Sequence, residues 1–119
     1  MSKHAVLALT ECLYLEVQTA GHDHIHVQAV LPGAVVSNIF ESAGGVDPGE
    51  SGDVAAAEAQ RAAMLDIKAG AMDPLAAAET VFKQAAEGRF YLLTQPETVG
   101  AAMAKRADVL VSQRHPMLR

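Results

Sequence analysis

The chain has 119 residues, of which half are apolar but only 4% aromatic, and it carries one cysteine and a net charge of −5 at pH 7. This length predicts one domain at most, and the acidic balance argues against a nucleic acid or an anionic membrane as partner. The single cysteine, Cys12, excludes an internal disulfide framework and favours a reducing, cytoplasmic location. No apolar run approaches the ~20 residues of a membrane span and no signal peptide opens the sequence, so we expect a soluble protein.

Residues 2–20 predict a helix that is apolar on more than one side. Val6, Leu9 and Leu13 recur at three- and four-residue spacing, and Leu15 widens the apolar arc beyond one stripe. Such a helix packs against two layers, one of them its own sheet. We therefore expect its outer face to pair with a second helix or subunit, which predicts a homo-oligomer formed through helix 2–20.

A short, largely β-branched run over residues 25–31 predicts a buried parallel strand that ends at Pro32-Gly33. In an open α/β sheet, ligands bind in the crevice beyond the carboxyl ends of the strands. Residues 32–38 therefore occupy the place where such a protein would bind its ligand.

The rest of the chain predicts a loop, two helices, a second strand and a last helix. In chain order these are a Gly-rich acidic loop over 41–53, a helix over 54–69, a helix from 73 to about 87, a strand over 89–94 and a helix to about 111. Asp73-Pro74 has the residues of a helix N-terminus, and Gly88 is a helix stop. Thr94 and Glu97 have the spacing of a capping box.

The helix after Asp73 is expected to turn a mostly apolar face inward. That face comprises Leu75, Ala78, Val81, Phe82 and Ala85. With a strand on each side of the crossover, the order predicts a parallel βαβ unit. Two parallel strands are fewer than a stable sheet needs, so the chain is expected to form one edge of a larger sheet.

Three segments of this sequence resemble the short-chain dehydrogenase/reductase family. The start of the chain is similar to the helix after the family's catalytic tyrosine, and Lys3 matches the lysine of its Tyr-x-x-x-Lys motif. Pro32-Gly33-Ala34-Val35-Val36-Ser37 resembles its Pro-Gly-x-Val-x-Thr segment, with Ser37 in place of Thr. Residues 88–97 look like the last strand and C-terminal helix of some members. The resemblance covers essentially the whole chain.

The resemblance implies an α/β fold, namely the C-terminal part of a Rossmann-like doubly wound parallel sheet, comprising its last two strands with flanking helices. In this interpretation residues 1–40 hold the first helix, strand and Pro-Gly loop, residues 41–72 a flexible substrate loop, and residues 73–119 the last strand and helices. The implied activity is hydride transfer between NAD or NADP and a small carbonyl or alcohol substrate.

The resemblance also implies roles for single residues. Lys3 is carried over as the catalytic lysine that also binds the cofactor ribose. The residues carried over to the rest of the cofactor site are Pro32, Gly33, Val35 and Ser37.

Three catalytic features of the family have no counterpart in these residues. The tyrosine would stand two positions before Met1, and both the catalytic serine and the Gly-rich nucleotide loop are missing. We therefore expect the 119-residue chain by itself to be inactive, as a fragment of an oxidoreductase. The alternative is a non-catalytic interaction protein that pairs through helix 2–20.

Other residues that suggest chemistry have simpler explanations. Tyr14 lies eleven residues along the helix from Lys3, about 16 Å away, so it is expected to be a packing residue. The Gly49–Gly52 turn lacks the spacing of a phosphate loop and is flanked by acidic residues. Three histidines, His22, His24 and His26, have no carboxylate or thiol cluster to complete a metal site, so no metal is expected.

Overall fold

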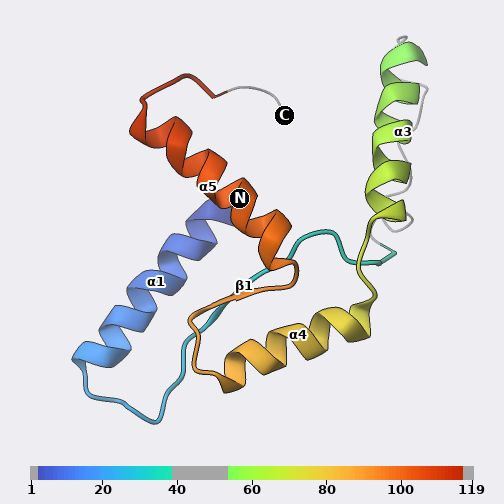
Figure 1. Cartoon of the computed structure of the whole chain (residues 1–119). Helices are drawn as coiled ribbons and strands as arrows, with labels where there is room; N and C mark the ends of the chain where they lie inside the picture. Colours follow the sequence, from blue (N-terminus) through green and yellow to red (C-terminus); the bar gives the residue numbers. More distant parts are fainter. Residues whose placement is uncertain (1–2, 39–53, 117–119) are drawn as a thin grey trace. The chain divides into compact units, whose positions relative to one another are not determined.

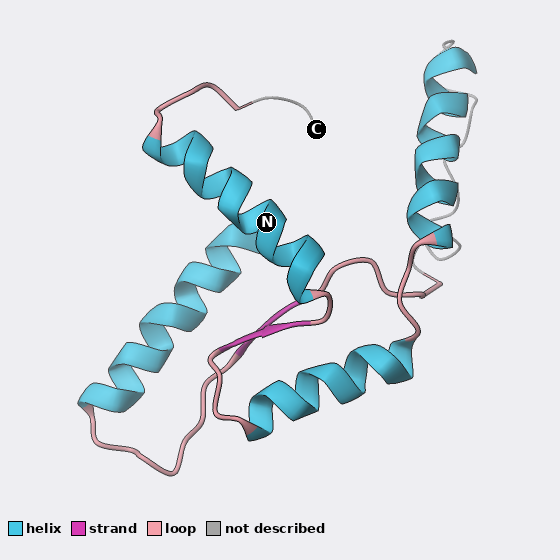
Figure 2. Ribbon diagram, viewed as in Figure 1, coloured by secondary structure: helices cyan, strands magenta, loops and turns pink. Residues whose placement is uncertain are grey.

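A computed structural model describes residues 3–38 and 54–116 (Figure 1). Its elements are α1 (Lys3–Thr19), β1 (Ala29–Leu31), α3 (Val54–Ala69), α4 (Pro74–Ala86), β2 (Tyr91–Leu93) and α5 (Pro96–Val111). Figure 2 shows the helices and the single pair of strands of the described part. The predicted mixed α/β class is confirmed at this level. The predicted loop over 41–53 lies outside the described residues.

The chain divides into two compact units, which are described separately. The first unit comprises residues 1–33 and 78–119 and contains α1, both strands and α5. The second unit comprises residues 34–77 and contains α3. Helix α4 begins in the second unit and ends in the first.

Helix α1 ends where the sequence predicts. Gly21 adopts a φ of +74°, a left-handed conformation that glycine reaches without steric cost. The His22 N–H then donates to the Val17 C=O at 3.2 Å, and the Gly21 N–H to the Gln18 C=O at 3.1 Å. These two bonds form the Schellman motif, which satisfies carbonyl groups that the helix end would leave unpaired.

Both predicted ends of α4 are also confirmed. The Asp73 carboxylate accepts hydrogen bonds from the N–H groups of Leu75 at 3.0 Å and Ala76 at 3.2 Å, as an N-cap residue does. Gly88 has a φ of +76° and follows the last turn, where its N–H donates to the Ala85 C=O. Local sequence signals therefore set the length of this helix.

The two strands are parallel, as predicted, but shorter than the predicted ranges of 25–31 and 89–94. Ala29 lies opposite Tyr91 and Leu31 opposite Leu93. The residues that precede Arg89 are Gly88 and the last turn of α4, and neither is extended. Residues 25–28 therefore have no extended chain from this segment with which to pair. The Gln28 side chain instead donates to the Arg89 C=O at 2.9 Å. Side-chain bonding replaces the ladder there, so the strand is limited to three residues.

The inward face of α4 differs from the prediction. Leu75 and Phe82 were expected to face inward but are 75% and 73% exposed. Gln84 is buried because its side chain bonds the backbone of Leu93 in β2. Since Phe82 lies two residues before Gln84, about 200° around the helix, it points to the opposite side.

Few apolar side chains are buried in the described residues. Those with less than a tenth of their surface exposed are Ala29, Ala77, Leu92 and Val99. All are small or medium in size, and many larger apolar residues remain exposed on α1, α4 and α5. A parallel sheet is normally covered on both faces, so this amount of burial is low for the class.

In the second unit, helix α3 matches the predicted helix over 54–69. Val35 forms a parallel bridge with Met72: the Val36 N–H donates to the Met72 C=O at 3.0 Å, and the Met72 N–H donates to the Ala34 C=O at 2.8 Å. This bridge fixes the chain that follows the Pro-Gly turn against the chain that precedes α4. Across the described ranges of both units, none of the helices has the length and apolarity needed to cross a membrane.

Candidate functional site at the strand ends

The Pro32-Gly33 turn is fixed by a buried hydroxyl at the end of the neighbouring strand. The Gly33 N–H donates to Thr94 Oγ1 at 2.9 Å, and the Thr94 hydroxyl donates to Gln95 Oε1 at 2.7 Å. Thr94 is only 4% exposed, so water does not compete for these bonds. The carboxyl ends of β1 and β2 are thus joined by a short polar chain.

The space where a side chain at Gly33 would begin is occupied by the end of the Gln95 side chain. A Cβ added at this position would lie 2.9 Å from Gln95 Cδ and 3.3 Å from Val99 Cγ2, and closer still to Gln95 Oε1. A larger residue at this position would have to displace the end of the Gln95 side chain.

The predicted capping box at Thr94 is wrong. The N-cap of α5 is Gln95, and no side chain provides a cap hydrogen bond. The Thr94 hydroxyl instead accepts from the Gly33 N–H and donates to Gln95 Oε1. Glu97 does lie in the first turn of α5, where the helix dipole favours an acidic side chain.

Lys3 is the first residue of α1, and its side chain is exposed. Among the described residues it has no hydrogen-bond or ion-pair partner. Figure 1 shows α1 running in one direction and β1 returning in the other, so the start of α1 and the end of β1 lie on the same side of the first unit. No contact joins Lys3 to Gly33.

The other predicted cofactor residues differ in their surroundings. Pro32 is exposed and directly follows β1. Val35 is half-buried at its bridge with Met72, and Ser37 is exposed; both belong to the second unit. The structure therefore joins Gly33 to β2 and Val35 to Met72.

Helix α1 contacts Phe90 and the first residue of β2, Tyr91. The Tyr14 ring meets the Phe90 ring edge to face, with centroids 5.0 Å apart, so Tyr14 is a packing residue, as predicted. The Tyr91 hydroxyl donates to Glu11 Oε1 at 2.7 Å, and this bond, with a smaller contribution from burial, raises the pKa of Tyr91. Tyr91 is half-exposed, so it is not the core residue that a place inside a strand suggests.

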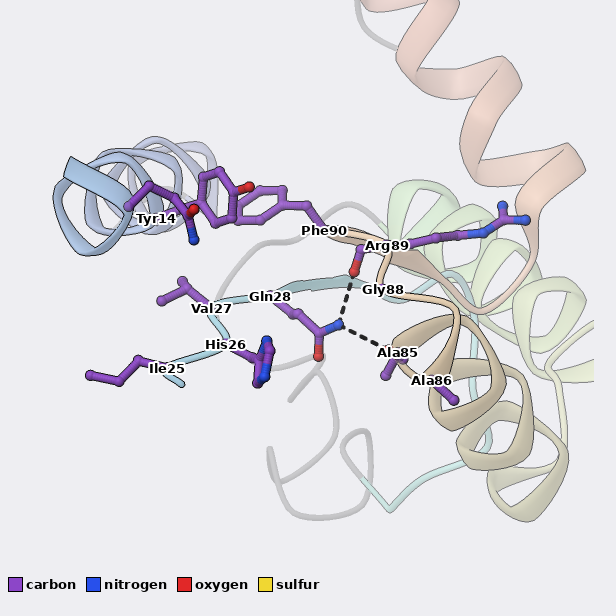
Figure 3. A pocket seen from close by; sticks show the side chains of 11 residues that line it. Tyr14, Ile25, His26, Val27, Gln28, Ala85, Ala86, Gly88, Arg89 and Phe90 are labelled. Carbon is purple, nitrogen blue, oxygen red and sulfur yellow. Dashed lines mark hydrogen bonds between the residues drawn. The ribbon is translucent and has the colours of Figure 1, made fainter. Parts of the chain in front are cut away.

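A separate pocket of about 470 Å³ lies in the first unit, at the amino ends of the strands (Figure 3). Tyr14 and Phe90 line one side, and Gln28 and His26 another. The Gln28 amide is oriented by the Arg89 C=O at 2.9 Å and, more weakly, by the Ala85 C=O at 3.4 Å. This pocket is at the opposite end of β1 from Gly33, so it is distinct from the candidate site.

Metal-ligating residues do not gather in the described part of the chain. No group of three His, Cys, Asp or Glu side chains there is placed to hold a metal ion. The rings of His22 and His24 lie 5.8 Å apart, edge to face, near the end of α1. They contact each other, and within the described ranges no carboxylate completes a ligand set with them.

Comparison with known proteins adds no relative: no family model, no curated protein and no solved structure matches this chain. A functional assignment therefore depends on the geometry at the ends of the two strands.

Proposed function

We propose that this chain is the C-terminal part of a nicotinamide-dependent oxidoreductase, and that NAD or NADP binds beside Pro32-Gly33. One observation carries the proposal: the Gly33 N–H is bonded to Thr94 Oγ1 across the carboxyl ends of two neighbouring parallel strands. Ligands of doubly wound sheets bind beyond these ends. A turn locked by a buried threonine gives a flat cofactor ring a rigid backbone surface.

In this proposal the chain supplies one wall of the site. Pro32 and Gly33 lie against the nicotinamide, and Lys3 donates hydrogen bonds to the ribose hydroxyls. Val35 and Ser37, which belong to the second unit, are proposed as further cofactor residues from the family resemblance alone. Bound NAD or NADP would exchange a hydride with a small carbonyl or alcohol substrate. In this proposal a tyrosine near Lys3 acts as the acid or base, and Lys3 assists it. Tyr14 does not take that role, because it lies eleven residues along α1 from Lys3, about 16 Å away, and packs on Phe90.

The proposal predicts what precedes Met1 in the coding sequence. An in-frame tyrosine codon two positions upstream, with a Gly-rich loop farther upstream, would supply the missing wall. A stop codon or frameshift at that place would contradict an intact enzyme. The purified 119-residue chain is expected to give no turnover of NADH or NADPH. Measurable turnover would contradict the proposal that the catalytic site is incomplete in these residues.

The polypeptide translated from the longer reading frame gives the decisive test. It is expected to oxidise NADH or NADPH with a carbonyl substrate, and Lys3→Met is expected to remove most of that activity. Lys105→Met is the matched control, because Lys105 is also exposed and lies on α5. Equal activity in both variants would remove Lys3 from the site.

A second candidate function is supported by the surface of α1. Val6, Leu9 and Leu13 follow one stripe of this helix and are all exposed, Leu9 at 70%. This stripe supports a non-catalytic interaction protein that pairs through α1. Leu9→Glu is then expected to weaken self-association in sedimentation, whereas Leu110→Glu, at an exposed position on α5, is not. A chain that is monomeric throughout would contradict this candidate.

A further inference from the structure

The ladder between β1 and β2 does not continue into the segments that precede the two strands. Ala29 lies opposite Tyr91, and its N–H donates to the Phe90 C=O at 2.8 Å. The same parallel pattern, continued two residues back, would join the Phe90 N–H to the Val27 C=O. Neither of these two groups has a hydrogen-bond partner within the described ranges. The segments therefore separate here and leave a backbone donor and a backbone acceptor open.

The pocket of about 470 Å³ at the amino ends of the strands occupies this gap (Figure 3). Its lining residues come from α1 and from the segments that precede the strands, within 25–28 and 85–90. All of them belong to the first unit. The Gln28 side chain reaches across the gap to Arg89, so the pocket is on the β2 side of β1. A further strand paired with the outer edge of β1 would therefore not occupy it.

The Gln28 side chain presents an oriented acceptor to this pocket. Its amide nitrogen faces two carbonyl oxygens, the Arg89 C=O at 2.9 Å and the Ala85 C=O at 3.4 Å, so the amide oxygen lies on the other side. Figure 3 shows this oxygen turned away from Arg89. Oε1 has no partner among the described residues, while both N–H groups are used. A molecule bound here meets the Gln28 amide as an acceptor and has to bring a donor.

The walls of the pocket favour a neutral molecule with an aromatic ring. Tyr14 and Phe90 form an edge-to-face pair on one side, an arrangement to which a further ring can add. Among the described lining residues none is acidic, so a cation would find no carboxylate. The lining guanidinium, Arg89, is paired with Glu87 at 2.8 Å and is directed away from the aromatic pair, so it does not serve an anion in the pocket. The volume is within the range of about 300–1,000 Å³ that is typical of small-molecule sites.

We propose that this pocket binds a small aromatic primary amide. The ring packs on Tyr14 and Phe90, the amide N–H groups donate to Gln28 Oε1 and the Val27 C=O, and the amide oxygen accepts from the Phe90 N–H. A primary amide supplies two donors and an acceptor, whereas a carboxylate supplies no donor and an ammonium no acceptor. The pocket is at the opposite end of β1 from Gly33, so the inference does not rest on the proposed oxidoreductase function.

A series of ligands of equal size tests the inference on the unchanged 119-residue chain. Benzamide is titrated while NMR follows the Gln28 side-chain amide, the Phe90 backbone amide and the Gly33 amide. Saturable shifts are expected at Gln28 and Phe90, and none at Gly33. Acetophenone has no donor, and benzoate has none and adds a negative charge, so both are expected to bind at least about tenfold more weakly. No saturable shift with benzamide, or equal affinity for acetophenone, would overturn the proposal.

Two variants separate the polar contact from the aromatic one. Gln28→Met keeps the length of the side chain but removes the acceptor, so benzamide is expected to bind at least about tenfold more weakly and acetophenone about as before. Tyr14→Leu leaves the bonds of Gln28 to Arg89 and Ala85 in place, and it is expected to weaken both ligands alike. Gln113→Met, at an exposed glutamine after α5, is the matched control. Benzamide binding that is equal in Gln28→Met and the control, or unaffected by Tyr14→Leu, would overturn the proposal.

Discussion

The side-chain amide of Gln84 pairs with both backbone groups of Leu93, accepting its N–H at 2.9 Å and donating to its C=O at 2.7 Å. Gln84 is buried, so these bonds are protected from water. One side chain thus makes the bonds of a neighbouring strand and attaches α4 to β2 with a fixed rotation.

Gln84→Leu is expected to lower the free energy of unfolding by about 2 kcal/mol, because two backbone groups of Leu93 lose their partner while most of the apolar packing is kept. Urea denaturation measures the loss. Gln18→Leu on α1 is the matched control, since the Gln18 side chain is exposed. A loss equal to that of the control would show that the Gln84 pair does not contribute to stability.

Gln84→Glu separates the donor from the acceptor. A carboxylate still accepts from the Leu93 N–H, but it faces the Leu93 C=O without a proton, which raises the pKa of the new carboxyl in the folded state. A raised folded pKa means that the stability contribution is full below the unfolded value of about 4.3 and is lost as the pH rises through the folded value. The variant should therefore approach wild-type stability only in acid, and a deficit that does not change with pH would contradict this explanation.

Thr94→Val is expected to destabilise the first unit by about 1–2 kcal/mol, because the Gly33 N–H loses its acceptor in a buried place. Amide hydrogen exchange at Gly33 should become faster in this variant. Thr94→Ser keeps the hydroxyl, so exchange at Gly33 should stay slow even though a methyl group is lost. Fast exchange in both variants would show that packing of the methyl, and not the hydrogen bond, holds the turn.

Gly33→Ala is expected to lower the free energy of unfolding by about 1–3 kcal/mol, since the added Cβ must displace the Gln95 side chain and break its bond with Thr94. In a Gln95→Ala background the same change should be less harmful, although Val99 Cγ2 would still lie 3.3 Å from the Cβ. A double-mutant cycle with urea denaturation gives the coupling between the two positions. Zero coupling would contradict the close approach.

The helix ends could be predicted from the sequence because the groups that form them are close together along the chain. Gly21 and Gly88 each adopt the left-handed conformation two residues after the end of a helix, and Asp73 bonds N–H groups two and three residues ahead. The parallel relation of the strands was also predictable, because a helical crossover connects them. These features require no knowledge of distant contacts.

The parts that sequence reasoning missed depend on residues far apart in the chain. Thr94 has the local spacing of a cap, but its oxygen is taken by Gly33, 61 positions away. In α4 an apolar pattern favoured Leu75 and Phe82, whereas the polar bond of Gln84 to β2 decides which face is buried. A glutamine among apolar residues was the available signal, and it was not used. The proposed roles of Lys3, Val35 and Ser37 stay predictions.

Replacing Glu11 provides a test of the contact between α1 and β2. The hydrogen bond to Glu11 raises the pKa of Tyr91 above its ordinary value, so the protonated phenol is the form that folding stabilises. This contribution is full below the unfolded pKa of about 10 and is lost as the pH rises through the higher folded value. Glu11→Gln should lower the Tyr91 pKa and reduce the loss of stability in strong alkali.

Ultraviolet titration in a Tyr14→Phe background, which leaves Tyr91 as the only tyrosine, measures the shift. Glu16→Gln, on the same helix, is the matched control, and an equal shift in both variants would indicate general charge in place of the specific bond.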